Sequence, residues 1–211
     1  MRKTEIKLCA FGIERKIIKM LKKSDILNII KTGLILFLIT GIAAFVLSAV
    51  NNVTEPIITK NNAKKQEAAM KKVMPEAETF ENDGLDGFCD DVVSEIYEAK
   101  KAEETVGYVA VAEPNGYNGA VTVVVGVDRT GKVTGVDITS QSETAGLGAN
   151  CTKDEFKDSF KGKTAGITVV KNNAKNNQID ALTSATITSK AVTKGVNAAI
   201  DAAAKAEEAK K

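Results

Sequence analysis

The chain has 211 residues, with 29 Lys and Arg, 27 Asp and Glu, three Cys and no His. The absence of histidine excludes a Ser-His-Asp triad, a Cys-His pair, a His-Glu-x-x-His zinc site and a histidine-ligated haem. Three widely spaced cysteines, at positions 9, 89 and 151, are too few for an all-cysteine zinc or iron–sulfur site within one chain. Any chemistry must therefore use carboxylates, amines, hydroxyls or a bound cofactor.

Charge divides the chain unequally. Residues 1–31 carry nine basic and three acidic side chains, a net charge of +6, whereas the remaining 180 residues carry a net charge of −4. The mildly acidic body argues against nucleic-acid binding. The basic head precedes an apolar run, and this order favours a role at a membrane.

The run from residue 32 to residue 50 contains no charged side chain. A bilayer core about 30 Å thick needs roughly 20 such residues in a helix. A buried core helix usually keeps a polar face, and a signal peptide usually has a shorter apolar region, so we predict a retained single-span anchor. The basic residues before the span place the N-terminus in the cytoplasm and the chain from residue 51 onward outside.

An amphipathic pattern occupies the basic head. Five apolar residues between Phe11 and Leu21 alternate with lysines up to Lys23. The pattern fits a helix lying on the anionic inner leaflet, and a solvated basic tail is the alternative.

A helical stalk is expected after the membrane span. Thr54 is a candidate N-cap, Pro56 suits a first helical turn, and Pro75 stops the helix that we predict from residue 56 to residue 73.

The part of the chain after the stalk is rich in β-branched residues. We expect strands and a short helix there, followed by a last helix that Ser189 caps and that frays after Ala204. The expected strands are 94–100, 106–112, 120–127, 132–139 and 167–171, the short helix is 154–160, and 171–177 is a polar loop. Strands closed by terminal helices predict an α+β domain.

Two segments are candidates for chemistry. Residues 140–148 follow a strand and combine two glycines with several hydroxyls, which lets the backbone approach a ligand closely. Residues 180–189 carry five hydroxyls just before the last helix, whose N-terminal N–H groups favour an anion such as a phosphate on Thr186. From composition alone, an ordinary surface loop and a capping segment are the alternatives.

Both segments resemble signatures of the FMN-binding domain family. Asp180-x-x-Thr183-Ser184-Ala185-Thr186 resembles that family's flavinylation motif, Asp-x-x-(Ser/Thr)-(Gly/Ser)-Ala-Thr. The run from Glu143 to Gly148 resembles the second signature, Glu-Thr-Pro-Gly-Leu-Gly, and residues 116–119 also fit. The pattern is similar to the G subunit of Rnf-type ion-translocating ferredoxin:NAD oxidoreductases, a near relative of the C subunit of sodium-pumping NADH:quinone reductases.

The resemblance implies a covalent cofactor. It implies that a flavin transferase takes FMN from FAD and joins its phosphate to the hydroxyl of Thr186. No catalytic side chain and no metal ligand are implied. The motif around the attachment site comprises Asp180, Thr183, Ser184 and Ala185. The residues expected beside the flavin are Glu143, Thr144, Leu147 and Gly148.

Three positions depart from the usual family pattern. Ala145 replaces a proline, which should make its loop less rigid. Ser184 replaces the commoner glycine and adds bulk. Gln141 occupies a position that is often histidine, so that histidine is not needed for the redox step.

The implied function is electron transfer through the flavin, as a subunit of a membrane complex that moves Na⁺ or H⁺. Its partners would be the other subunits of the complex, the transferase and the membrane. The alternatives are a quinone-reductase C-type subunit, a stand-alone extracytoplasmic flavin carrier and, from a different class, an anchored binding module without redox activity; a hydrolase has almost no support.

Cys89 and Cys151 could form a disulfide or remain thiols. The expected segments are a cytoplasmic basic segment (1–31), a transmembrane helix (32–50), a helical stalk (51–75), an FMN-binding domain (76–204) and a charged C-terminal tail (205–211).

Overall fold

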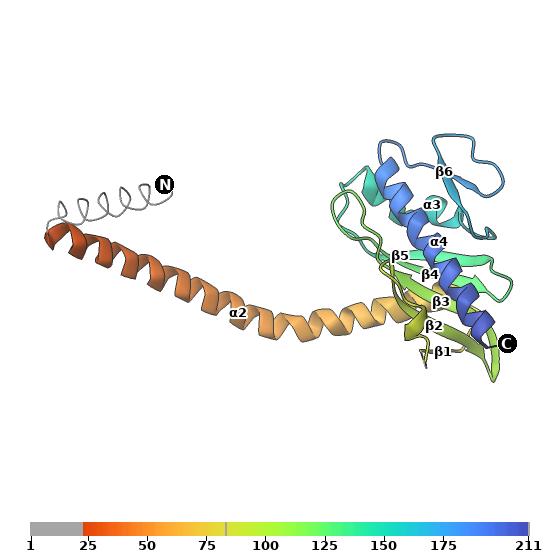
Figure 1. Ribbon diagram of the computed structural model, residues 1–211, viewed down its shortest axis with the longest axis horizontal. Helices are drawn as coiled ribbons and strands as arrows, with labels where there is room; N and C mark the ends of the chain where they lie inside the picture. The colour runs from red at the N-terminus through yellow and green to blue at the C-terminus, as the bar shows by residue number, and fades with distance from the viewer. Residues whose placement is uncertain (1–22, 83, 211) are drawn as a thin grey trace, which may run out of the picture. The chain divides into compact units, whose positions relative to one another are not determined.

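The computed structural model describes residues 23–82 and 84–210. The predicted amphipathic stretch of the basic head lies almost wholly outside these residues. The chain forms two compact units, one up to residue 59 and one over residues 60–211. The second unit contains all the strands of the described residues and the C-terminal helix (Figure 1).

One helix, α2 (Lys23–Val73), contains both the predicted membrane span and the predicted stalk. It is long and apolar enough to cross a membrane, and its residues from 26 to 59 are exposed, which makes it a candidate membrane span. The prediction of a new helix starting at Pro56 is wrong, because Pro56 lies inside α2. Thr54 is not a cap either: its hydroxyl donates to the carbonyl of Val50, one turn earlier in the same helix. Proline removes only one backbone donor, so the flanking helix-forming residues continue the helix past it.

An antiparallel sheet in the order β1-β2-β3-β4-β5 forms the centre of the second unit. Its strands are β1 (Thr79–Glu81), β2 (Val93–Lys101), β3 (Glu104–Ala112), β4 (Thr122–Asp128) and β5 (Val133–Ser140). The four longer strands were predicted from β-branched residues and turn signals, with bounds within two residues. The short β1 was not predicted, because three residues give no readable alternation.

Smaller elements follow the sheet. They are η1 (Asp86–Phe88) before β2, then η2 (Gly148–Thr152), α3 (Asp154–Asp158), β6 (Thr168–Val170) and β7 (Gln178–Asp180), and β6 pairs in parallel with β7. The predicted polar loop, 171–177, connects these two strands. The mixture of helices and antiparallel sheet confirms the α+β prediction.

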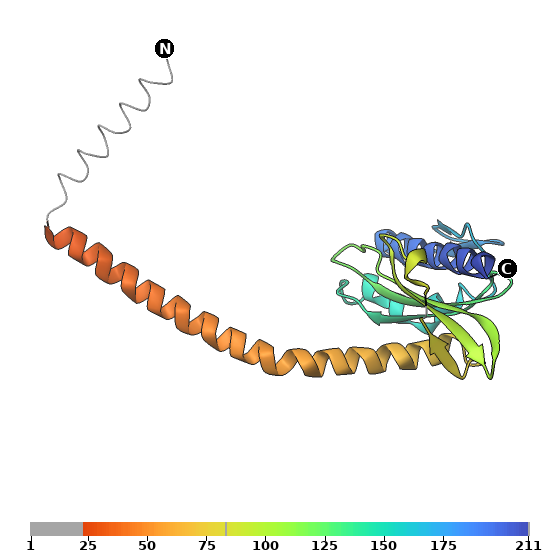
Figure 2. The same ribbon diagram turned by 60° about the horizontal axis from the view of Figure 1, so that its bottom comes forward.

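Helices cover both faces of the sheet (Figure 2). On one face Val123, Val125 and Val127 of β4 join the core that α4 (Thr186–Ala209) covers. On the other face Val124 packs in a second cluster with Val73 at the end of α2. Because successive side chains of a strand point to opposite faces, burial of both faces explains why β4 reads as a continuous apolar run.

The end of α2 approaches the sheet at backbone distance. A Cβ added to Gly126 would lie 2.7 Å from the carbonyl oxygen of Val73, and one added to Gly135 would lie 3.0 Å from the Cα of Val73. Thr134 donates its hydroxyl to that same carbonyl oxygen at 2.6 Å. The glycines therefore make room for the helix end, and Thr134 satisfies one of its orphan carbonyls.

Helix α4 differs from its prediction at both ends. It begins at Thr186 rather than after a Ser189 cap, and it continues to Ala209 rather than fraying after Ala204. At the far end Ala206 is buried, and Glu207 accepts hydrogen bonds from Tyr108 and Arg129. These tertiary contacts stabilise a last turn whose local sequence is only Lys, Glu and Ala.

Candidate functional site

A cleft of about 520 Å³ opens where two loops meet the N-terminus of α4. One loop connects β3 to β4, and the other follows β5. The lining residues come from these three segments alone: Tyr117, Glu143, Thr144, Leu147, Gly148, Ser184, Ala185, Thr186, Ile187 and Thr188. The cleft therefore brings together residues that lie far apart in the sequence, such as Tyr117 and Thr186, which are about 70 positions apart.

Thr186 is the first residue of α4, and its side chain is exposed. Ala185 stands at the N-cap position, where no side chain caps the helix, and the first turn contains no acidic residue. The first N–H groups of a helix have no intrahelical acceptor and carry the positive end of the helix dipole. The N-terminus of α4 therefore offers backbone donors to an anion held near the Thr186 hydroxyl.

A tight turn explains why the helix begins three residues before its predicted cap. The N–H of Ala185 donates to the carbonyl of Leu182 at 2.9 Å, which closes a turn through Thr183 and Ser184. Ser184 adopts a φ of +59°, in the left-handed region that favours glycine. Ser189 is instead buried within the first turns, where its hydroxyl accepts the N–H of Leu182 and donates to the carbonyl of Ala185.

Glu143 connects the three segments of the site. Its Oε1 accepts the N–H groups of Tyr117 and Asn118 at 2.9 and 3.0 Å, and its Oε2 accepts the hydroxyl of Thr188 at 2.6 Å. The residue is 8% exposed. Burial alone would raise the pKa of Glu143, but the hydrogen bonds from Thr188, Asn118 and Tyr117 outweigh it and lower the pKa below its ordinary value. The carboxylate is therefore ionised at neutral pH.

Two glycines make room for this carboxylate. A Cβ at Gly148 would lie 2.5 Å from Glu143 Oε2 and 2.7 Å from Thr188 Oγ1. A Cβ at Gly116 would collide with Glu143 Oε1. The two loops can therefore close on the Glu143 side chain only because both positions lack side chains.

The loop after β5 turns sharply at Gly146. The N–H of Leu147 donates to the carbonyl of Thr144 at 3.1 Å, and Gly146 has a φ of +79°. In a type II turn, glycine suits this third position and proline suits the second, which Ala145 occupies. Gln141 stabilises the start of the loop, since its side-chain oxygen accepts the N–H of Glu143 at 2.6 Å.

Apolar side chains form the rim of the cleft. Tyr117, Leu147 and Ile187 are 70%, 41% and 55% exposed. Within the described part of residues 60–211, they are the exposed large hydrophobic side chains, and all three line this cleft. Exposed apolar surface gathered at one concave place indicates a binding site for an apolar group.

The residues named from sequence separate into two groups. The cleft gathers seven of the nine: Glu143, Thr144, Leu147, Gly148, Ser184, Ala185 and Thr186. Asp180 and Thr183 instead line a neighbouring cleft of about 540 Å³, where Asp180 Oδ1 accepts the N–H of Ala174. Tyr117, Ile187 and Thr188 were not assigned a role from sequence. Tyr117 could have been found as an aromatic residue between Gly116 and Gly119. Ile187 and Thr188 could have been found from helix periodicity after Thr186.

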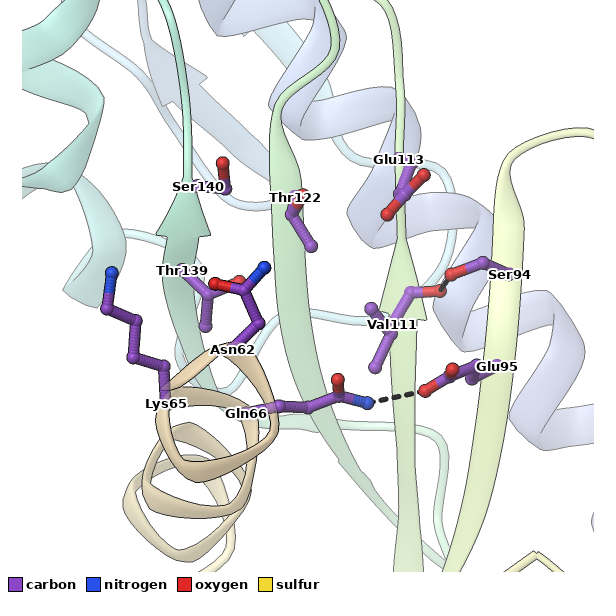
Figure 3. Close-up of a pocket in the computed structure, with 10 residues that line it drawn as sticks. All are labelled: Asn62, Lys65, Gln66, Ser94, Glu95, Val111, Glu113, Thr122, Thr139 and Ser140. Atoms are coloured by element: carbon purple, nitrogen blue, oxygen red, sulfur yellow. Dashed lines mark hydrogen bonds between the residues drawn. The ribbon is translucent and has the colours of Figure 1, made fainter. Parts of the chain in front are cut away.

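A third cleft, of about 240 Å³, lies between α2 and the sheet (Figure 3). The Gln66 amide reaches from α2 and donates to Glu95 of β2, while Ser94 donates to the carbonyl of Val111. Its lining is mostly polar and includes none of the residues named from sequence. The Gln66–Glu95 hydrogen bond joins α2 to the sheet, and the Ser94 hydrogen bond joins β2 to β3.

Cys151 is a buried free thiol and thus does not pair with Cys89. Burial, with a smaller effect from the Glu143 charge, raises the pKa of Cys151 to about 11. A thiol with so high a pKa is protonated at neutral pH and is unreactive. It packs in the core cluster beneath α4.

Comparisons with known proteins agree with this geometry. Residues 116–201 match the FMN-binding domain family, and residues 20–73 match the RnfG N-terminal region. The first match spans the loop between β3 and β4 that holds Gly116 and Gly119 (the glycine loop), the loop after β5 and the start of α4. It therefore includes every segment of the cleft.

Curated relatives extend the comparison. The G subunit of the proton-translocating ferredoxin:NAD(+) oxidoreductase complex of Clostridium ljungdahlii is 39% identical over 55% of this chain and 59% of that protein. The G subunit of the Na(+)-translocating complex of Acetobacterium woodii is 37% identical over 59% of this chain and 65% of that protein. The chain thus spans about three fifths of the length of these relatives.

A solved structure shares the fold. Shewanella oneidensis NqrC superposes with a TM-score of 0.52 at 14% identity, covering 70% of this chain and 99% of that chain. At this identity the likeness concerns the fold alone. The two family matches lie at the N-terminal helix and around the cleft, so the chain combines an RnfG N-terminal region with an FMN-binding domain.

Proposed function

We propose that this protein is the flavin-carrying subunit of an Rnf-type complex that couples ferredoxin:NAD electron transfer to ion translocation, with FMN joined through its phosphate to Thr186. The observation that carries the proposal is the position of Thr186. Its exposed hydroxyl lies at an uncapped helix N-terminus, inside a cleft with an apolar rim.

The residues of the cleft fit FMN in two respects. The N–H groups at the start of α4 suit a phosphate, which would carry negative charge next to the positive end of the helix dipole. The side chains of Tyr117, Leu147 and Ile187 offer apolar surface to a planar ring system. Bound FMN supplies one- and two-electron transfer, and the protein supplies position and electrostatics.

Attachment requires a flavin transferase and FAD. The hydroxyl oxygen of Thr186 forms a bond to the phosphorus of the FMN moiety, the pyrophosphate bond breaks and AMP leaves. The hydroxyl proton is released to solvent. The exposure of Thr186 supports access by such an enzyme.

The anchor is assigned to the apolar part of α2. The basic excess before it supports a cytoplasmic N-terminus and a flavin domain on the outer side of the cell membrane. Residues 32–50 hold no ionisable side chain, so this span offers no ion path and translocation belongs to partner subunits. The match to the RnfG N-terminal region favours a subunit of an Rnf-type complex over a subunit of a quinone reductase. The two similar relatives are named for different ions, H⁺ and Na⁺, and the proposal includes either.

Mass spectrometry tests the attachment. Protein produced with a flavin transferase should carry the mass of an FMN phosphoryl group on the peptide that contains Thr186, and should show a fluorescent band after denaturing electrophoresis. T186V should abolish both signals. T168V is the matched control, because Thr168 is another exposed threonine of the same domain but lies in β6, outside both signatures and the Thr186 cleft. A fluorescent T186V protein would contradict the assignment.

A further inference from the structure

The wall of the Thr186 cleft contains a single charged side chain. Of the ten residues that line the cleft, Glu143 alone belongs to the Asp, Glu, Lys and Arg group. Its Oε2 contacts Thr188, two residues after Thr186, at 2.6 Å. Any group attached to Thr186 therefore occupies a cleft whose one fixed charge is negative.

No cation compensates this charge within the described residues. The ion pairs recorded there do not include Glu143, whereas the buried Glu98 pairs with Lys100 and Lys210. The partners of Glu143 are two backbone N–H groups and one hydroxyl. These donors lower the pKa of Glu143 and keep it ionised, but they leave its full charge in place. In a partly buried setting such a charge acts over several ångströms with little screening.

The three hydrogen bonds do not by themselves require a carboxylate. Glutamine has the same shape, and its oxygen could accept both N–H groups of Tyr117 and Asn118. Its amide group could donate to the hydroxyl oxygen of Thr188. The charge of Glu143, rather than its hydrogen-bonding shape, is therefore the property that distinguishes this residue from an isosteric amide.

We propose that Glu143 acts as a fixed negative charge that lowers the reduction potential of the flavin bound at Thr186. This inference rests on the proposed function. In the two-electron couple, oxidised flavin takes two electrons from a reduced partner subunit, or from an electrode, and one proton from solvent. The product is an anionic reduced flavin with one more negative charge. A nearby carboxylate repels that added charge and stabilises the oxidised form.

The test compares potentials of the full-length, flavin-loaded protein and its E143Q variant, measured by spectroelectrochemistry. We expect E143Q to shift the ratio of oxidised to reduced flavin at least tenfold toward the reduced form, which corresponds to a rise of about 30 mV for a two-electron couple. The matched control is E98Q, which neutralises another buried carboxylate near Lys210, at the opposite end of α4. Its potential should equal that of the wild type.

Each outcome has a defined meaning. A loaded E143Q protein with an unchanged or lower potential overturns the proposal. So does an E143Q protein that folds but does not load, because the amide should keep the three hydrogen bonds of Glu143 and with them the shape of the cleft. Wild-type protein without flavin on the Thr186 peptide contradicts the proposed function instead.

A flavin-free measurement checks the structural premise. Hydrogen exchange in a T186V background reports whether the N–H groups of Tyr117 and Asn118 stay protected. E143Q should retain most of this protection and E143A should lose it. Equal loss in both variants would show that glutamine cannot replace the hydrogen bonds, and would overturn the separation of charge from shape.

Discussion

Thr188 donates its hydroxyl to the Glu143 carboxylate over 2.6 Å, although the two residues lie 45 positions apart in the chain. The contact joins the second residue after the predicted attachment threonine to the loop after β5. Since Glu143 also accepts two N–H groups of the glycine loop, one carboxylate determines how three segments meet. The geometry of the cleft thus depends on the Glu143 side chain, which accepts a hydrogen bond from the first turn of α4.

Removing this hydroxyl should destabilise the protein. In T188V one carboxylate oxygen stays buried without its donor, which should lower the free energy of unfolding by about 1–3 kcal/mol. The matched control is T193V, because Thr193 is also buried in α4 but donates to the carbonyl of Ser189 within its own helix. Urea unfolding of the two variants measures the difference. Equal effects would show that the Glu143 contact contributes nothing specific.

Ser184 provides a test of backbone conformation. Its φ of +59° is unfavourable for a residue with a Cβ, so S184G should stabilise the native turn by about 1 kcal/mol. S184V should destabilise it, because a β-branched side chain tolerates the left-handed region poorly. Thermal unfolding of the three proteins gives the order. If the wild type proves more stable than S184G, the Ser184 hydroxyl stabilises the turn by more than the backbone strain destabilises it.

Ala145 provides a test of loop rigidity. It occupies the second position of the Thr144–Leu147 turn, and the backbone hydrogen bonds recorded outside helices and strands do not use its N–H. A145P should therefore raise the free energy of unfolding by about 0.4–1 kcal/mol, because proline restricts the unfolded chain. G146A should lower it, since alanine is strained at a φ of +79°. Chemical denaturation measures both changes. A destabilised A145P protein would mean that the turn does not accept proline.

Acid should weaken the contribution of Glu143. Its pKa is lowered in the folded protein relative to an unfolded value of about 4.3. The carboxylate therefore stabilises the fold fully above the unfolded pKa, and this contribution is lost as the pH falls through the folded pKa. Urea unfolding at a series of pH values should show the stability gap between wild type and E143Q shrinking on acidification. A gap that stays constant with pH would contradict the pKa direction.

The sequence predicts the large elements of this fold for identifiable reasons. Continuous β-branched residues predict β4, and the Asp128–Gly131 turn, in which Asp128 accepts the N–H groups of Thr130 and Lys132, predicts the β4–β5 hairpin. The start of α4 could not be placed correctly. Ser189 reads as a cap locally, but its hydroxyl is used inside the helix by the turn at Leu182.

The candidate site was only partly predictable. Motif resemblance identifies Thr186 and Glu143, but gives no indication that Glu143 accepts hydrogen bonds from both the glycine loop and α4. That role depends on contacts between residues 25 to 45 positions apart, which local patterns do not encode. Thr188 and Ile187 were missed for the same reason. The opposite applies to Asp180 and Thr183, since sequence adjacency groups them with Thr186 although they line a different cleft.

The docking of α2 against Gly126 and Gly135 bears on where a soluble fragment can begin. The last turns of that helix contribute Ala69, Met70 and Val73 to the cluster on one face of the sheet. A fragment that starts at residue 76, the predicted domain boundary, would leave the apolar side chains of Val109 and Val124 without this cover. Such a fragment should aggregate, whereas a fragment that starts at residue 60 retains the whole cluster. The last turns of α2 therefore belong to the folding unit of the flavin domain.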